Sequence, residues 1–240
     1  MGNIKNSKKW VVPILMFIFC EFIYRQHLVK YLLDRDYLVV NFFENSFLNK
    51  TFSFGLLNFA IAVIILLISK FIFKEKLTSI DSSDKMSLRK SAIIVFSAVV
   101  VTIIIFYLLT YIIYDILGSS VNSAAAMYIR EISMRNKYIY VIFTFFTVTF
   151  EEVVYRKLLF GYLYDLHSGC NKYVRFITSL LGSVIIFGAV HDGVLSSGMI
   201  YYVIAGISFT IVYFYTKRIS AAIAIHFLYN ICLRLILTII

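Results

Sequence analysis

The sequence predicts an all-α, polytopic bundle of about seven transmembrane helices, within a range of six to eight. The 240 residues are 61% hydrophobic and 18% aromatic, with a mean hydropathy of +0.86. These values exceed those of soluble domains. The apolar residues form continuous runs that can cross about 30 Å of hydrocarbon as helices. The runs show no alternation with a period of two, so helices are favoured over a β-barrel.

Each predicted span is an apolar run bounded by polar residues, and the first and fifth runs are the shortest. The predicted spans are Trp10–Tyr24, Phe52–Phe73, Ser91–Ile116, Tyr138–Leu159, Phe176–Val190, Gly198–Thr216 and Ile219–Ile240. With the N-terminus in the cytoplasm, 14 lysines and arginines, including Arg156 and Lys157, fall in cytoplasmic segments. Seven, including Arg25, fall in outer loops. This bias follows the positive-inside rule and predicts a multi-pass plasma-membrane protein.

The net charge of +10 is thus explained by membrane topology, which argues against a nucleic-acid partner. Two parts are expected along the chain. Residues 1–90 hold divergent N-terminal helices and a polar cytoplasmic linker, and residues 91–240 hold the core, with the motifs within 150–231. The first three helices are rich in bulky apolar residues, which suits a lipid-facing scaffold, whereas later helices carry small residues that favour close packing. The three scattered cysteines indicate neither a disulfide framework nor a thiolate metal site.

Glu151 and Glu152 stand next to each other in a strongly apolar stretch. Carboxylates at membrane depth are costly and usually functional. Glu152 and Arg156 are four residues apart, which places them on one helix face as an ion pair. Glu151 points about 100° away and has no such intrahelical partner, so it is left to accept a proton as a general base. The alternative is an ordinary solvated cluster at the cytoplasmic headgroup boundary, next to Lys157.

The other polar side chains of interest lie in two later apolar segments. His191 ends the fifth segment and, taken alone, fits an interfacial histidine as well as a catalytic one. His226 and Asn230 are four residues apart on one face of the seventh segment. Such a pair can donate two hydrogen bonds to a developing oxyanion, or can hold neighbouring helices together. The sequence contains no HExxH, di-iron ExxH, Walker A, Rossmann glycine or GxSxG pattern.

In order, these residues match the patterns EExxxR, FxxxH and HxxxN, from Phe150 to Ile231. The chain resembles the CPBP (Abi) family of intramembrane proteases, which includes type II CAAX prenyl endopeptidases and bacteriocin-processing or bacteriocin-immunity proteins. The resemblance implies that Glu151 and His191 activate a water molecule. It also implies that His226 and Asn230 stabilise the oxyanion, while Glu152 and Arg156 keep the site in shape. The three motifs must meet in one pocket, although helix geometry places His191 nearer the outer face than His226.

The resemblance requires no cofactor; zinc is the less favoured alternative, because Glu152 is committed to Arg156. The expected partners are the lipid bilayer and a peptide or membrane-protein substrate near the cytoplasmic face of a bacterial plasma membrane. The specificity for prenylated CAAX substrates is not carried over. Two rival functions are a non-catalytic bacteriocin-immunity or surface-display scaffold, and a transporter with a Glu/His proton relay. The complete motif set argues against the scaffold, and the lack of repeated halves argues against the transporter.

Overall fold

The computed structural model describes residues 7–74, 76–116, 118 and 123–239, and the regular secondary structure of these residues is entirely helical. Seven of the described helices are long and apolar enough to cross a membrane, which confirms the predicted polytopic helical fold. They are Val11–Asp34, Ser46–Phe71, Leu88–Ile116, Lys137–Leu166, Lys172–Asp192, Met199–Thr216 and Ile219–Ile236. The chain divides into two compact units: unit 1 is Met1–Ser83 with Ile132–Ser179, and unit 2 is Asp84–Glu131 with Leu180–Ile240.

The first helix is longer than predicted. It runs from α1 (Ser7–Ile18) through the π-type turns of η2 (Phe19–Val29) into α2 (Lys30–Asp34). The prediction that it ends at Tyr24 is therefore wrong, and Arg25 lies inside a helix rather than in an outer loop. The helix can continue because Arg25 forms an ion pair with Glu21 one turn earlier, so both charges are balanced within it.

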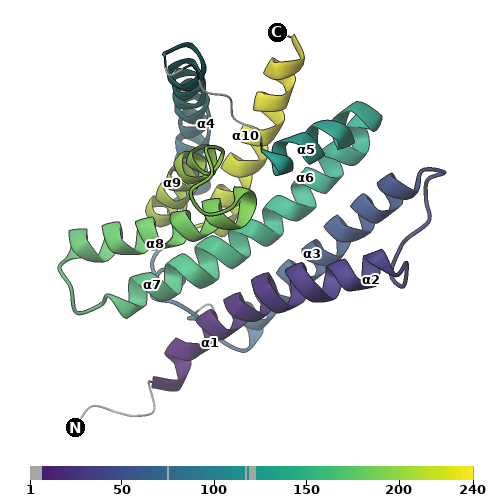
Figure 1. Cartoon of the computed structure of the whole chain (residues 1–240). Coiled ribbons are helices and arrows are strands. Elements are labelled where there is room, and N and C mark those ends of the chain that lie inside the picture. Colours follow the sequence, from purple (N-terminus) through teal and green to yellow (C-terminus); the bar gives the residue numbers. More distant parts are fainter. Residues whose placement is uncertain (1–6, 75, 117, 119–122, 240) are drawn as a thin grey trace. The chain divides into compact units, whose positions relative to one another are not determined.

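Unit 1 is built from three long helices that lie side by side (Figure 1). The first is the α1–α2 helix, and the second is α3 (Ser46–Phe71). The third continues from α6 (Lys137–Glu152) through the π-type turns of η4 (Val153–Phe160) to α7 (Gly161–Leu166). Because η4 contacts both α1 and α3, the residues that follow Glu152 pack against the N-terminal helices. These helices therefore take part in the packing around the acidic motif.

Close packing of α3 against α6 holds this arrangement together. A Cβ atom added to Gly55 would lie 3.1 Å from the Phe143 ring, so the glycine lets the two helices approach closely. The rings of Phe59 and Phe146 stack with their centroids 4.8 Å apart. At the other end of α6–α7, Lys157 donates a hydrogen bond to Asp81 at 2.6 Å and ties the polar segment after α3 to η4.

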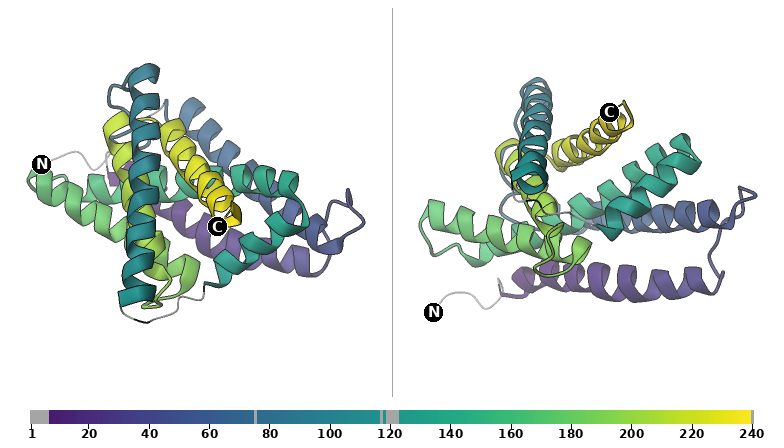
Figure 2. Two further views of the ribbon diagram at one scale, coloured as in Figure 1. Left: turned by 90° about the horizontal axis from the view of Figure 1, so that it is seen from above. Right: turned by 45° about the horizontal axis from the view of Figure 1, so that its top comes forward.

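Unit 2 is built from α4 (Leu88–Tyr111), α9 (Met199–Thr216) and α10 (Ile219–Ile239), which pack against one another (Figure 2). η3 (Ile112–Ile116) prolongs α4. Two further helices, α5 (Ala124–Arg135) and α8 (Lys172–Asp192), contain residues of both units. The buried core of unit 2 is apolar and includes Val95, Val99, Phe209, Ile225 and Tyr229.

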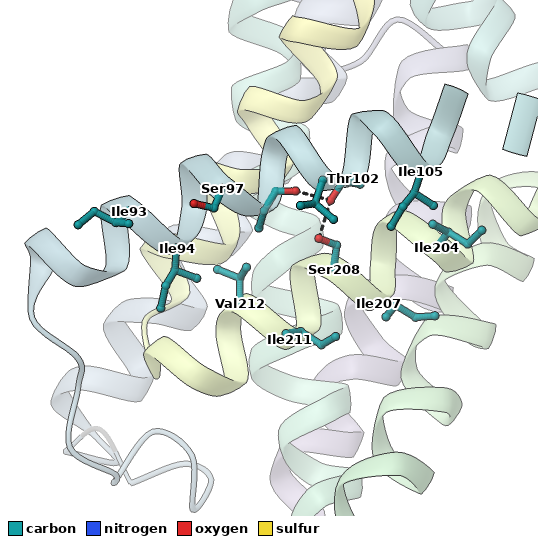
Figure 3. A pocket seen from close by; sticks show the side chains of 12 residues that line it. Ile93, Ile94, Ser97, Thr102, Ile105, Ile204, Ile207, Ser208, Ile211 and Val212 are labelled. Atoms are coloured by element: carbon teal, nitrogen blue, oxygen red, sulfur yellow. Dashed lines mark hydrogen bonds between the residues drawn. The ribbon is translucent and has the colours of Figure 1, made fainter. Parts of the chain in front are cut away.

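An apolar groove of about 610 Å³ follows the seam between α4 and α9 (Figure 3). Isoleucine and valine side chains form most of its lining. Its polar contact is a hydrogen bond between the hydroxyls of Thr102 and Ser208, 2.6 Å apart, and Thr102 also donates to the carbonyl oxygen of Ala98. This bond joins the two helices across an otherwise apolar interface.

Candidate functional site

The predicted ion pair between Glu152 and Arg156 is confirmed. Arg156 Nε lies 3.1 Å from Glu152 Oε2, and the two side chains are 1% and 0% exposed. Glu152 ends α6 and Arg156 lies in η4, one turn later in the same continuous helix. This degree of burial contradicts the alternative of a solvated cluster at the headgroup boundary. Two buried charges in contact fit a structural ion pair rather than charged groups that are hydrated by solvent.

Glu151 faces a different arginine, which the sequence analysis placed elsewhere. Arg25 Nη1, from η2, lies 3.5 Å from Glu151 Oε1, and the two side chains are 14% and 13% exposed. The first helix thus supplies Glu151 with a basic partner that the sequence analysis did not anticipate. The first helix, whose composition suits a lipid-facing scaffold, thus also contributes a charged side chain next to the acidic motif.

Arg25 is itself held by a second carboxylate. Its Nε donates a hydrogen bond to Glu21 Oε1 at 3.0 Å, and its Nη2 donates to the same oxygen. Gln26 Nε2 donates to that oxygen as well, at 3.2 Å. The guanidinium group also lies over the Phe150 ring, 5.9 Å from its centroid. Hydrogen bonds to Glu21 thus hold Nε and Nη2 of Arg25, while Nη1 faces Glu151.

Glu21, Arg25, Glu151, Glu152 and Arg156 form what we call the buried charge cluster. Arg156 interacts electrostatically with both glutamates of its own helix, which links the two ion pairs. Tyr155 is completely buried and interacts electrostatically with Arg25, Glu21 and Glu151. Three carboxylates and two guanidinium groups leave one excess negative charge when all five are ionised. One added proton would make the cluster electrically neutral.

In unit 2, the geometry of His191 suits a proton acceptor. Its Nδ1 lies 2.7 Å from the carbonyl oxygen of Phe187, one turn earlier in α8. A carbonyl oxygen only accepts hydrogen bonds, so Nδ1 carries the proton and Nε2 of the neutral ring has a lone pair. The imidazole also stacks on Tyr202 of α9, with centroids 4.8 Å apart, so its orientation is defined on two sides.

His226 lies in an aromatic environment on α10. It is 6% exposed and stacks on Phe209, with ring centroids 4.3 Å apart. Phe187 contacts it from α8 at 6.1 Å and also lies 4.3 Å from the His191 ring. One aromatic side chain therefore contacts both histidines. Asn230 is partly buried one turn further along α10.

The structure groups the predicted site residues in two sets. Glu151, Glu152 and Arg156 belong to unit 1, and the two histidines with Asn230 belong to unit 2. That both sets share one pocket stays a prediction. Within each unit, the described residues include no group of three His, Cys, Asp or Glu side chains placed to hold a metal ion.

Sequence reasoning missed Glu21, Arg25 and Tyr155. A signal was present, because Glu21 and Arg25 repeat the spacing of Glu152 and Arg156 inside another apolar segment. Applied to the first helix, the argument used for Glu152 would have identified a second intramembrane ion pair. The contact between Arg25 and Glu151 is different, since it joins residues far apart in the chain and depends on helix packing.

Comparison with known proteins finds a family model that matches the part of the chain in which the predicted site residues lie. A family model described as type II CAAX prenyl endopeptidase Rce1-like matches residues 133–232. This stretch is therefore similar to the Rce1-like CAAX proteases. All six predicted site residues lie within the Rce1-like domain, whereas Glu21 and Arg25 precede it. The resemblance stated from the motifs is thereby confirmed.

A curated relative supports the same assignment. The membrane-embedded CAAX protease MroQ of Staphylococcus aureus (strain USA300) is 36% identical over 80 residues. The match covers 33% of this chain and 31% of that protein. No solved structure matches the chain. The similarity to MroQ therefore extends over about a third of each protein and not over the whole of either.

Proposed function

We propose that the protein is an intramembrane endopeptidase that hydrolyses peptide bonds with water activated by Glu151 and His191. The observation that carries this proposal is the excess carboxylate of the buried charge cluster. Glu151, which lies in the stretch matched by the Rce1-like family model and 3.5 Å from Arg25, is the carboxylate to which we assign the role of base. A nearly buried carboxylate that can take up a proton meets the requirement for a general base.

In the proposed reaction, Glu151 takes a proton from water and the water oxygen attacks the peptide carbonyl carbon. The carbonyl electron pair moves to oxygen, where hydrogen bonds from His226 and Asn230 stabilise the oxyanion. When the tetrahedral intermediate collapses, the C–N bond breaks and the departing nitrogen receives the proton that Glu151 took. His191 accepts a hydrogen bond from the water through Nε2 and aligns it. No covalent enzyme intermediate forms.

The surroundings of each group fit these roles. Phe209 and Phe187 exclude water from the His226 ring, and a hydrogen bond to developing charge is worth more where water is excluded. Glu152 takes no part in the chemistry, because its carboxylate is engaged by Arg156. For the same reason we favour a reaction that needs no metal. Zinc held by the glutamates and histidines is the less favoured alternative.

The proposed substrate is a peptide or a membrane-protein segment near the cytoplasmic face of a bacterial plasma membrane, with the N-terminus of the protein in the cytoplasm. The positive-inside distribution of charge supports this orientation. MroQ is described as a CAAX protease, but prenylated CAAX substrates are not proposed for this chain. A non-catalytic immunity or surface-display scaffold is the competing function.

Purified protein in lipid nanodiscs, incubated with a peptide library in H₂¹⁸O, tests the proposal. Hydrolysis places ¹⁸O in each new carboxyl group, whichever peptide is cut. We expect Glu151→Gln to lower kcat by about 10²–10⁴-fold, the usual contribution of a general base. The exposed Glu44→Gln is the matched control and should keep full activity. Full activity of Glu151→Gln, in this assay or in cells, would exclude the proposed mechanism and favour the scaffold, while loss of activity with a chelator would favour zinc.

A further inference from the structure

Arg25 occupies the position from which the orientation of Glu151 can be controlled. It contacts two carboxylates at once: Glu21, through Nε and Nη2, and Glu151, through Nη1 at 3.5 Å. The hydrogen bonds to Glu21 are intrahelical, and Glu21 is completely buried. The guanidinium group is therefore held by Glu21 on its own helix, and its Nη1 faces Glu151 on the neighbouring helix.

We propose that Arg25, anchored by Glu21, is a positioning residue for Glu151 and that the N-terminal helix is thus part of the catalytic apparatus. This inference rests on the proposed function. It extends the site to two residues outside the Rce1-like domain matched at 133–232. Arg25 acts through Glu151 and has no contact with the peptide bond in this proposal.

The physical reason is the geometry of the guanidinium group. It is planar and presents its N–H groups in fixed directions, so a guanidinium held on one side restricts a carboxylate on the other. At a general base, an error of about 1 Å in position can cost 100-fold in rate. Glu21 also limits the attraction, because its carboxylate offsets the positive charge that Glu151 experiences. Glu151 is thus oriented and can still accept a proton.

A purely structural role for the same ion pair makes a different prediction. On that view Arg25 only compensates the buried charge of Glu21, and removing both groups together should restore both stability and activity. The positioning role predicts that the neutral double variant Glu21→Gln/Arg25→Gln regains stability and stays impaired in catalysis. The double variant therefore separates the two explanations.

The experiment compares Arg25→Gln, Arg25→Lys and the Glu21→Gln/Arg25→Gln double variant, each as full-length protein in nanodiscs. Thermal unfolding and the ¹⁸O assay are measured on the library peptide that the wild type cuts fastest. We expect Arg25→Gln and the double variant to lose about 100-fold in kcat with KM unchanged. Arg25→Lys keeps the positive charge but loses the planar guanidinium group. Its kcat should therefore lie between that of Arg25→Gln and that of the wild type. The double variant should unfold at a temperature closer to the wild type than Arg25→Gln does.

The matched control is the neutral double variant Asp81→Asn/Lys157→Gln, which removes another buried ion pair of the same unit. It should retain wild-type kcat. If the Glu21→Gln/Arg25→Gln variant keeps wild-type kcat while Glu151→Gln is inactive, Arg25 is structural and the proposed function stands. If Glu151→Gln is fully active, the proposed function itself fails. If the control variant loses as much kcat as the Arg25 variants, the effect is not specific to Glu151 and the positioning role is rejected.

Discussion

Arg156→Met is the substitution that most directly tests the physical description of the buried charge cluster. The structure places Arg156 Nε 3.1 Å from Glu152 Oε2, with both side chains within 1% of complete burial. Methionine keeps an unbranched chain in the same space, so little of the effect should come from a cavity. What is lost is the guanidinium that compensates the Glu152 carboxylate. Removing one partner of a buried ion pair costs about 3–5 kcal/mol.

The neutral double variant Glu152→Gln/Arg156→Met supplies the comparison. It removes both charges, and replacing a whole buried pair is usually close to neutral. We therefore expect it to recover at least about 2 kcal/mol of the loss, since no charge is then left behind in the interior. Equilibrium unfolding in mixed detergent micelles, followed by circular dichroism, measures the free energy of unfolding for both variants. A loss below about 1 kcal/mol in Arg156→Met, or a double variant no more stable than the single one, would refute the reasoning.

Two further substitutions test the packing of unit 2 by the same unfolding assay. Thr102→Val removes the interhelical hydrogen bond to Ser208 and should cost about 0.6 kcal/mol, the average for such bonds in membranes; a gain in stability would show that the bond is not stabilising. Gly188→Ala should cost about 1–3 kcal/mol, because the added Cβ would lie 2.8 Å from Val203 and 3.1 Å from a backbone oxygen of α9. An unchanged stability of Gly188→Ala would mean that α8 and α9 can separate slightly without loss.

Local patterns in the sequence predicted much of the fold. The seven spans are apolar runs, and a run long enough to cross a bilayer leaves its backbone no better arrangement than a helix. The ion pair between Glu152 and Arg156 could also be predicted from the sequence, because residues four apart on a helix share a face. The end of the first helix was mispredicted for a related reason. Glu21 and Arg25 lower the hydropathy of their segment, although each compensates the charge of the other.

The contacts between helices could not be predicted in this way. Nothing in the sequence near Arg25 or near Glu151 indicates that the two side chains approach within 3.5 Å. That contact exists because the first helix packs against the helix that carries Glu151 in unit 1. The same holds for the contact of Phe187 with His226, which depends on how α8 meets α10. Each helix could have turned a different face to its neighbours without any change in its own pattern of apolar residues.

The amino-acid sequence by itself determined a helical membrane protein with an acidic motif, two histidines and an asparagine in apolar segments. These features depend on hydropathy and on the 3.6-residue turn, which act over a few residues. Only the tertiary structure decided that the N-terminal helix supplies an arginine to Glu151 and that His191 and His226 flank one phenylalanine ring. The physical reason is that side chains far apart in sequence meet only through the packing of whole helices, and packing is a property of the folded chain.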